Sequence, residues 1–430
     1  MIKKPGYAIL ALLTYGIIES LLLGYKYYII LAVLLFFTVA FEVIYFNIYG
    51  SGVVSRISVK RESDTVKFRK NRKFKITLHF VNGNKYPVTV HFFDEGIDIL
   101  EISGNTGGNI RIPANGYHDI EYWIVPRYIG KYQFGNIRIT VSDLFHIASI
   151  QKTFLSRSEI HISPSMSDIK SSRSEMLSSF LYTFGNHYSH KVGQGYNLYG
   201  VRPYTFDDDP RFIVWSRYDE ANNNLLVKQM EEEREITIIF IVDYSTSMNY
   251  GSSDRIYDRA VLDIINSSYF MVKNRDNVGF LLYSDAIKVY IPPDKGGKSI
   301  ESLEREVSDL IPSGNFNPLS AIKYLEKKQK KNALLFLITA SSSAAESIGY
   351  QRNLTIFIVN HESYYDYKPE GEFDALLIHD ARFREVNSLA RTASRIRNRG
   401  VRCEYVNRSN MMQRILFEYN YGRSMNKGAS

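Results

Sequence analysis

Cysteine is nearly absent from this sequence, and so are the short motifs that mark many enzymes. The 430 residues contain one cysteine, Cys403, which excludes an internal disulfide framework and a zinc site built from cysteines. Neither GxxxxGK[ST] nor GxGxxG occurs, so nucleotide binding is disfavoured. HExxH and a nucleophile elbow are also missing, and His187 and His190 lie in a polar stretch without such a motif. The sequence therefore favours binding over catalysis, with a metal-dependent hydrolase as the less favoured alternative.

Acidic residues are scarce in one stretch that carries most of the net charge of +8. Between residues 56 and 73 there are eight Lys or Arg and two acidic residues. This stretch directly follows the apolar N-terminal region, where basic residues are attracted to anionic lipid headgroups. No nucleic-acid-binding module is recognisable, so we expect a lipid bilayer as a partner and no nucleic acid.

Long apolar runs open the chain and predict a two-helix transmembrane hairpin over residues 1–50. Tyr7–Leu23 and Tyr27–Tyr49 are each long enough to cross a bilayer. A cleaved signal peptide would explain the first run but not the second. Lys3 and Lys4 precede the hairpin and the basic stretch follows it, which predicts a multi-pass protein of the cell membrane with its soluble domains in the cytoplasm.

Residues 51–165 change to short alternating segments separated by Asn-Gly, Gly-Asn and Gly-Gly turns. Regular strands with such punctuation are typical of an all-β sandwich-like domain. Residues 166–190 are rich in serine near their start and predict an exposed linker. Nothing in the β-rich region indicates catalysis.

Residues 236–420 predict a doubly wound α/β domain with a parallel sheet. Continuous apolar runs that indicate strands buried on both faces are Ile236–Val242, Val278–Tyr283, Ala333–Thr339, Leu354–Val359 and Val401–Val406. Helical patterns between them are Arg255–Asn274, Pro318–Lys330 and Arg382–Arg399. Ligands of such sheets bind beyond the carboxyl ends of the strands, so those ends are where we look for a site.

A DxSxS pattern follows the first of these strands. Asp243, Ser245 and Ser247 are oxygen-bearing side chains at alternate positions, and they can converge on one hard cation. Mg²⁺ commonly keeps several waters, so three such side chains suffice as half of a site. The structural alternative is a turn in which Asp and Ser cap the next helix.

These residues resemble the metal-ion-dependent adhesion site of the von Willebrand factor A-like superfamily. More narrowly, the chain resembles a prokaryotic membrane family known as domain of unknown function fifty-eight. Residues 200–215, GVRPYTFDDDPRFIVW, are similar to its R-x-Y-x-x-G-D-x-x-R-x-I-D-W motif. The Leu226–Lys228 run, the acidic 231–235 stretch and the Asp143-Leu144-Phe145 turn also resemble this family. The likeness covers the chain from the hairpin onward.

The resemblance implies further metal ligands, and the sequence departs from it. Asn317 falls where the superfamily has a second-loop Thr, and Ala340 falls where it has a third-loop Asp. An Asn oxygen can ligate a cation or orient a water, but an alanine cannot. The expected site is Asp243, Ser245, Ser247 and Asn317, holding Mg²⁺ or another divalent cation more weakly than the complete superfamily site. Asp207 and Val214 replace the family's Gly and second Asp.

The segment 191–235 is expected to pack on the α/β domain, and its motif allows two interpretations. The residues concerned are Arg202, Tyr204, Asp208, Asp209, Arg211 and Trp215. They form either a partner-binding patch, since Arg and Trp are frequent anchors of interfaces, or a structural clamp. In the clamp, Arg and Asp pair in a bidentate manner, Trp215 packs beneath them, and together they fasten the segment to the sheet.

Taken with the resemblance, the sequence predicts a membrane-anchored, non-enzymatic protein–protein interaction module. Family members are thought to act with MoxR-type AAA+ ATPases in assembling or maturing other complexes, so such an ATPase is the expected partner. A metal-independent membrane scaffold is the alternative, and an extracellular adhesin would require the reverse membrane topology.

Overall fold

The computed structural model describes residues 4–24, 26–65, 68–97, 99–143, 147–155, 159–164, 192–217, 225–231, 235–252, 254–328 and 332–425. It divides into two compact units, Met1–Ser163 and Pro164–Ser430. The predicted linker 166–190, with His187 and His190, lies outside the described residues. The predicted order is confirmed at a coarse level: an apolar helical start, a β-rich middle and an α/β C-terminal region.

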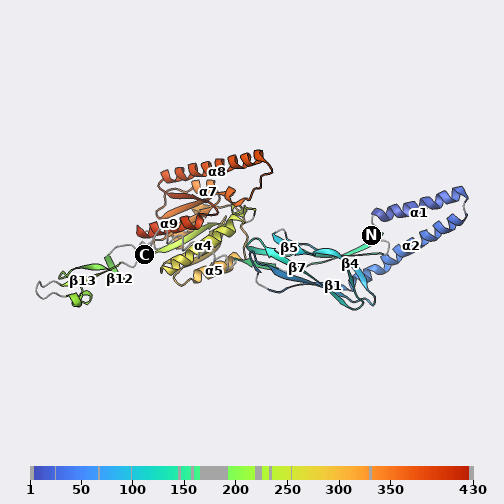
Figure 1. The fold of residues 1–430 in the computed structure, drawn as a ribbon, viewed down its shortest axis with the longest axis horizontal. Helices are drawn as coiled ribbons and strands as arrows, with labels where there is room; N and C mark the ends of the chain where they lie inside the picture. The colour runs from blue at the N-terminus through green and yellow to red at the C-terminus, as the bar shows by residue number, and fades with distance from the viewer. Residues whose placement is uncertain are drawn as a thin grey trace. The chain divides into compact units, whose positions relative to one another are not determined.

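Two helices begin the first unit, α1 (Lys4–Leu23) and α2 (Lys26–Ser55), and they run side by side (Figure 1). Within the described residues, Val33–Ser55 is the stretch whose length and composition would let it cross a membrane. A signal sequence near the N-terminus meets the same criterion. The structure therefore supports one apolar spanning helix, and the two-span hairpin stays a prediction.

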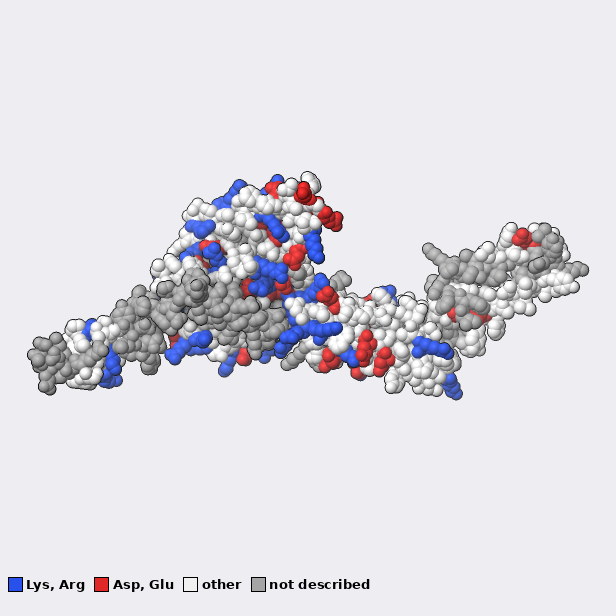
Figure 2. Space-filling model, viewed as in Figure 1, with Lys and Arg blue, Asp and Glu red and all other residues white. Residues whose placement is uncertain are grey.

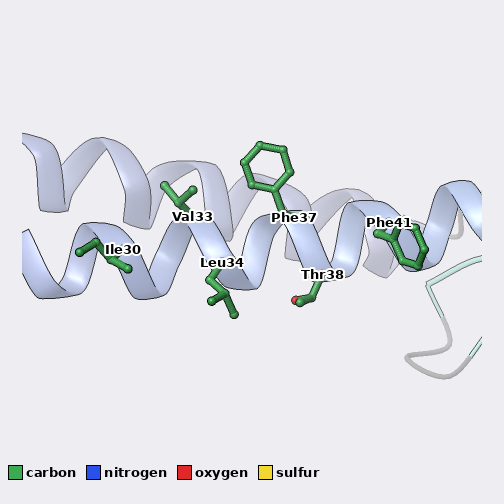
Figure 3. Close-up of a pocket in the computed structure, with 6 residues that line it drawn as sticks. All are labelled: Ile30, Val33, Leu34, Phe37, Thr38 and Phe41. Atoms are coloured by element: carbon green, nitrogen blue, oxygen red, sulfur yellow. The ribbon is translucent and has the colours of Figure 1, made fainter.

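The surface of α2 suits an apolar environment (Figure 3). Ile30, Leu34, Phe37 and Phe41 are all more than half exposed. Thr38 lies among them, but its hydroxyl donates to the carbonyl of Leu35 at 2.8 Å. A hydroxyl bonded inside its own helix needs no water, which is the condition for a polar group in hydrocarbon.

The β-rich part of the first unit is a sandwich of two four-stranded sheets, in the orders β1-β3-β7-β5 and β10-β9-β4-β6, with a three-stranded sheet β2-β11-β8. The strands are β1 (Ile57–Ser63), β2 (Phe68–Arg69), β3 (Phe74–Asn82), β4 (Val88–Asp94), β5 (Leu100–Gly104), β6 (Gly107–Ile112), β7 (Tyr117–Pro126), β8 (Gly130–Gln133), β9 (Ile137–Ser142), β10 (Ser149–Phe154) and β11 (Glu159–Ser163). Alternate residues of β4 are buried, and Phe80 meets Phe92 edge-to-face at 5.2 Å between the sheets. This alternation is the pattern that the sequence predicts for one-sided burial.

The C-terminal end of α2 is built into the sandwich. Val54 belongs to the sandwich core. Lys152 on β10 donates to the carbonyls of Val54, Ser55 and Ile57 at 3.4, 3.3 and 3.0 Å. A lysine at this position bonds the carbonyls that a helix end leaves unsatisfied and complements the helix dipole. Helix α2 and the β domain are therefore joined without a flexible linker.

The basic stretch after α2 is buried in part, and the attraction of its exposed residues to lipid stays a prediction. Arg61 is buried and ion-paired with buried Asp94, and Lys70 is also buried. Helix α2 ends at Ser55 and β1 runs to Ser63, eight residues further, which is roughly 25 Å along an extended strand. On the face in Figure 2, basic side chains of the described residues alternate with acidic ones.

The second unit begins with a two-stranded ribbon, β12 (Val192–Pro203) and β13 (Leu226–Glu231), which pair antiparallel. The connecting loop contains two short 3-10 helices, η1 (Pro210–Phe212) and η2 (Trp215–Arg217). Ile213 forms a bridge back to Val227 on β13. The family-like motif therefore lies on this loop.

A six-stranded sheet in the order β16-β15-β14-β17-β18-β19 forms the α/β domain. Its strands are β14 (Thr237–Asp243), β15 (Asn277–Tyr283), β16 (Ile287–Asp294), β17 (Leu334–Thr339), β18 (Leu354–Val359) and β19 (Arg402–Val406). All neighbours pair parallel except β15 and β16. The doubly wound prediction is confirmed, and β16 is an antiparallel edge strand that the sequence does not predict.

Helices cover this sheet, as Figure 1 shows. They are α4 (Ile256–Lys273), α5 (Lys298–Val307), α6 (Pro318–Lys328), α7 (Ser342–Glu346), α8 (Glu372–Asn398) and α9 (Met411–Ser424), with 3-10 helices η3 (Thr246–Asn249) and η4 (His361–Tyr364). Apolar residues of α6, α7 and α8 share one core cluster with β14, β17 and β18. On the other side, α4 contacts α5 and α9. Every residue of β14 is buried, which explains its unbroken apolar sequence.

Candidate functional site

The DxSxS residues lie at the carboxyl edge of the sheet, where the strand order reverses. Asp243 is the last residue of β14, which lies between β15 and β17. The connections that follow β14 and β17 lead to helices on opposite faces of the sheet. Ligands of doubly wound folds bind at such a point. Asp243 and Ser245 are buried, and Ser247 lies half-buried in η3, the 3-10 helix that follows. The predicted convergence of these three residues is thus what the structure contains.

Hydrogen bonds within the protein already satisfy the Asp243 carboxylate. Ser245 donates its backbone N–H to Oδ1 at 2.9 Å, and Ser247 donates its hydroxyl to Oδ2 at 3.1 Å. Thr339, at the end of β17, donates its hydroxyl to Oδ2 at 2.7 Å. The hydroxyls of Ser245 and Ser247 are 2.9 Å apart. These contacts fasten the ends of β14 and β17 to each other.

Asn317 and Ala340, the two departures from the superfamily, do not complete this cluster. The side-chain oxygen of Asn317 accepts the backbone N–H of Ser320 at 3.2 Å, so it caps the start of α6. Ala340 is buried and offers no oxygen ligand. The structure therefore brings together Asp243, Ser245 and Ser247 but assigns Asn317 a capping contact.

The donor set is a poor match for a divalent cation. The described part of the chain holds no group of three or more His, Cys, Asp or Glu side chains placed to bind a metal. Burial raises the pKa of Asp243, against the opposing effect of its hydrogen bonds, and a desolvated single carboxylate attracts a cation less than a paired set does. These residues fit half of an adhesion-type site and not the whole.

His361 and Glu385 also lie at this edge, and the sequence did not single them out. His361 follows β18, and its Nδ1 is 3.8 Å from Oε1 of Glu385 on α8. Its Nε2 is buried without a hydrogen-bond partner within the described structure. Burial lowers the pKa of His361, while the charges of Glu385, Glu362 and Asp243 oppose that change. Its place directly after a buried strand was the signal that could have identified it.

The motif loop between β12 and β13 contains the predicted bidentate pair. Both guanidinium nitrogens of Arg202 donate to the carboxylate of Asp208, one of them at 2.7 Å. Thr205 adds its backbone N–H and its hydroxyl to the same carboxylate, each at 2.8 Å. These donors lower the pKa of Asp208 to about 2, with the Arg202 hydrogen bond as the largest cause. The pair closes the loop on itself.

A second pair lies one residue further along. Asp209 caps η1 by accepting the backbone N–H of Arg211 at 3.0 Å, and its carboxylate also accepts from the Arg211 guanidinium at 2.6 Å. Tyr204 donates its backbone N–H to the carbonyl of Leu225 at 2.8 Å. All of these contacts join residues of the loop and its base, so the described clamp stabilises the loop and does not itself fasten the segment to the sheet.

Trp215 does not pack beneath the clamp, and this part of the prediction is wrong. Its side chain is 66% exposed, and Phe206 is 95% exposed. Arg211 is 86% exposed despite its ion pair. The clamp uses the polar residues of the motif, and the aromatic residues are left facing solvent.

Comparisons with known proteins agree with the sequence motif. Residues 200–364 match the family model described as "Protein of unknown function DUF58". No curated protein matches the chain. The conserved hypothetical protein BatB from Bacteroides thetaiotaomicron is 13% identical over 45% of this chain and 100% of its own, with a TM-score of 0.28.

Two solved structures resemble a shorter part of the chain. The FixG-related protein from Vibrio parahaemolyticus is 10% identical over 24% of this chain and 98% of its own, with a TM-score of 0.17. The cupredoxin domain of amoB from Nitrosocaldus yellowstonii is 8% identical over 25% of this chain and 86% of its own, with a TM-score of 0.19. These low scores assign neither a fold nor a function. The family match is different, because residues 200–364 include both the clamped loop and the Asp243 edge, and this segment of the chain is similar to the DUF58 family.

Proposed function

We propose that this chain is a membrane-anchored, non-enzymatic module that binds a protein partner through the loop between β12 and β13. The observation that carries this proposal is the exposure of Phe206, Arg211 and Trp215 on a loop held by the Arg202–Asp208 pair. Exposed Trp and Arg are the residues that most often dominate the energy of protein interfaces. A loop that is ordered before binding loses less conformational entropy on association.

Catalysis receives little support from the titratable groups of the described residues. Burial raises the pKa of Cys403 to about 12, which suppresses the thiolate that a cysteine nucleophile requires. The Ser247 hydroxyl donates to Asp243, and neither residue is paired with a histidine by a hydrogen bond. These features support a binding role over a hydrolase.

For the Asp243 edge, we favour a structural role that needs no cation. Thr339 and Ser247 already donate to the carboxylate that a cation would use, and Ala340 removes the second carboxylate. A cation-dependent adhesion site is the second candidate, because Asp243, Ser245 and Ser247 do gather at one point. In that case Mg²⁺ would be held by these three side chains and by waters.

A thermal shift measurement on the detergent-solubilised full chain distinguishes the two candidates. We expect Mg²⁺ or Mn²⁺ at millimolar concentration to leave Tm unchanged in both the wild type and Asp243→Ala. An increase of several degrees in the wild type that disappears in Asp243→Ala would establish the cation-dependent candidate instead.

The proposed partner is a MoxR-type AAA+ ATPase, which the family resemblance implies. The binding test compares the wild-type chain with the double variant Phe206→Ala/Trp215→Ala against such an ATPase from the same genome. Loss of two aromatic anchors should weaken binding at least about tenfold. Tyr350→Ala is the matched control, because Tyr350 is 69% exposed but lies on a different loop.

Two results would contradict this proposal separately. No binding by the wild type excludes the ATPase as partner, and equal binding by the wild type and the double variant excludes the loop as the binding surface. For the membrane, we propose that α1 and α2 form a two-span hairpin and that the soluble units face the cytoplasm, as the distribution of lysines predicts.

A further inference from the structure

Helix α8 is longer than the sheet that it covers. Its 27 residues extend about 40 Å, whereas the six-residue strand β18 beside it extends about 20 Å. Its buried residues, Leu389, Thr392, Ala393 and Ile396, all lie in the C-terminal half. The N-terminal half, from Glu372 to Glu385, therefore has little of the domain to pack against (Figure 1).

This free half carries an apolar stripe. Phe373, Leu376, Leu377 and Phe383 are 72, 67, 54 and 60% exposed. Their separations of three, four and ten residues place them on one side of an α-helix. An apolar face of this size that remains open to solvent usually marks an interaction surface.

The domain holds the other side of this helix. Arg382 lies over the ring of Tyr367 at 5.7 Å and donates to the carbonyl of Tyr365 at 3.3 Å. Glu385 faces His361. These contacts fix the rotation of α8 about its axis, so the stripe is turned away from the domain that holds it.

One oppositely charged pair interrupts the stripe. Arg384 contacts Asp380 at 2.6 Å, and the two side chains are 78 and 51% exposed. Four residues apart, they lie on the same side of the helix as Leu376, Leu377 and Phe383. Charges of opposite sign in the middle of an apolar face disfavour a lipid surface as its occupant, since lipid tails offer them no partner.

We infer that the free half of α8 is the contact surface for a second copy of this chain. In an antiparallel pair of α8 helices that cross near residue 380, the two Asp380 side chains meet at the two-fold axis, and Arg384 of each copy lies one turn away, where it can pair with both carboxylates. Leu377 of each copy then packs against Phe383 of the other. A two-fold interface requires such self-complementarity, because every contact occurs twice.

The size of the stripe suits pairing between two copies that are anchored in the same membrane. Four apolar side chains from each copy bury roughly 1,000 Å² in total, at the low end for specific interfaces. Confinement to a bilayer raises the effective concentration of the two copies, so a contact that is weak in solution suffices. The argument from effective concentration depends on the proposed membrane anchor, whereas the exposure of the stripe does not.

Cysteine cross-linking in membranes tests the pair. Cys403→Ala removes the one native cysteine, and full-length copies with Leu377→Cys are co-expressed with copies of different size that carry Phe383→Cys. Mild oxidation should yield the mixed disulfide dimer. Ala375→Cys replaces Leu377→Cys in the control, because Ala375 is exposed on another side of the same helix, and it should link several-fold less.

The charges provide an independent arm of the test. Asp380→Arg in both copies makes all four charges at the crossing positive and should lower the cross-linking yield several-fold, whereas Asp380→Arg/Arg384→Asp keeps two charges of each sign and should restore it. An unchanged Tm for each variant shows that folding is intact. Equal yields for Leu377→Cys and Ala375→Cys, or no mixed dimer at all, would overturn the inference. A failure of the ATPase-binding test leaves this result unaffected.

Discussion

Arg61 shows how one residue of an apparently exposed basic stretch becomes part of a core. Its guanidinium pairs with Asp94, donates to the carbonyl of Gly135 at 3.1 Å and lies over the Phe134 ring at 4.5 Å. Tyr122 donates to the same Asp94 carboxylate at 2.7 Å, and burial raises the pKa of this tyrosine. A buried ion pair adds little net stability, but removal of one partner leaves an unpaired buried charge.

Arg61→Ala should therefore destabilise the β sandwich by about 3–5 kcal/mol. The measurement is thermal unfolding followed by Trp123 fluorescence in a Trp215→Phe background, since these are the two tryptophans of the chain. Lys60→Ala is the control, because the neighbouring pair of Lys60 with Glu62 is largely exposed, and it should cost less than about 1 kcal/mol. Similar losses for both variants would contradict the buried role of Arg61.

Asp263 on α4 predicts a dependence of stability on pH. It is buried, and the described structure offers no hydrogen-bond partner to either carboxylate oxygen, although Arg259 lies 3.3 Å away. Burial raises its pKa to about 7. Between about pH 4 and 7 the folded state then binds more protons than the unfolded state, so stability falls as the pH rises through this window.

Asp263→Asn should accordingly stabilise the fold at pH 8, where the buried carboxyl group is charged in the wild type. We expect a higher Tm and a gain in the free energy of unfolding on the order of 4 kcal/mol at most. The gain should shrink as the pH approaches 5. Asp374→Asn, at an exposed position of α8, should show no such trend in the same scans. A gain for Asp263→Asn that is equal at pH 5 and pH 8 would show that its carboxyl group is not protonated in the folded state.

At the scale of elements, the junction between α2 and the sandwich depends on one lysine. Lys152→Met keeps most of the aliphatic side chain but removes two hydrogen bonds to the end of α2 and one to Ile57 at the start of β1. We expect a loss of about 1–2 kcal/mol and faster amide hydrogen exchange at residues 50–57. Lys131→Met, which breaks the exposed pair with Glu159, should leave exchange at the helix end unchanged.

At the scale of the whole molecule, the proposed membrane topology makes a prediction for single-cysteine labelling. In a Cys403→Ala background, Tyr27→Cys near the turn between α1 and α2 should react with a membrane-impermeant maleimide on intact cells. Lys60→Cys on β1 should react only after permeabilisation. Both native side chains are well exposed, at 89 and 76%, so access is not the limit. The reverse pattern would place the soluble units outside the cell.

Much of the fold was predictable because strands that are buried on both faces of a sheet have continuous apolar sequences. The apolar runs of β14, β15, β17, β18 and β19 match the predicted strands to within a residue or two. The predicted helix Arg382–Arg399 covers only the second half of α8, and the first half was missed although its apolar residues also lie at helical spacing. The short helix α5 and the edge strand β16 were missed, although α5 has a clear amphipathic pattern.

The candidate site was predictable only in part. Asp243, Ser245 and Ser247 follow one strand, so their convergence needs nothing beyond the position of that strand. Thr339 and His361 reach the same edge from other strands, and only the order of strands in the sheet makes them neighbours. The capping role of Asn317 likewise depends on where α6 begins.

The sequence by itself determined the apolar helix, the β-rich and α/β regions and the family motif, because hydrophobic periodicity and local spacing are properties of adjacent residues. The tertiary structure decided which charges are buried, which aromatic residues face solvent and how far α8 projects. Those outcomes depend on contacts between residues far apart in the chain: Arg61 meets Asp94 from another sheet, whereas Trp215 finds no cover. Burial is a property of the assembled fold, so the same type of side chain can be buried at one position and exposed at another.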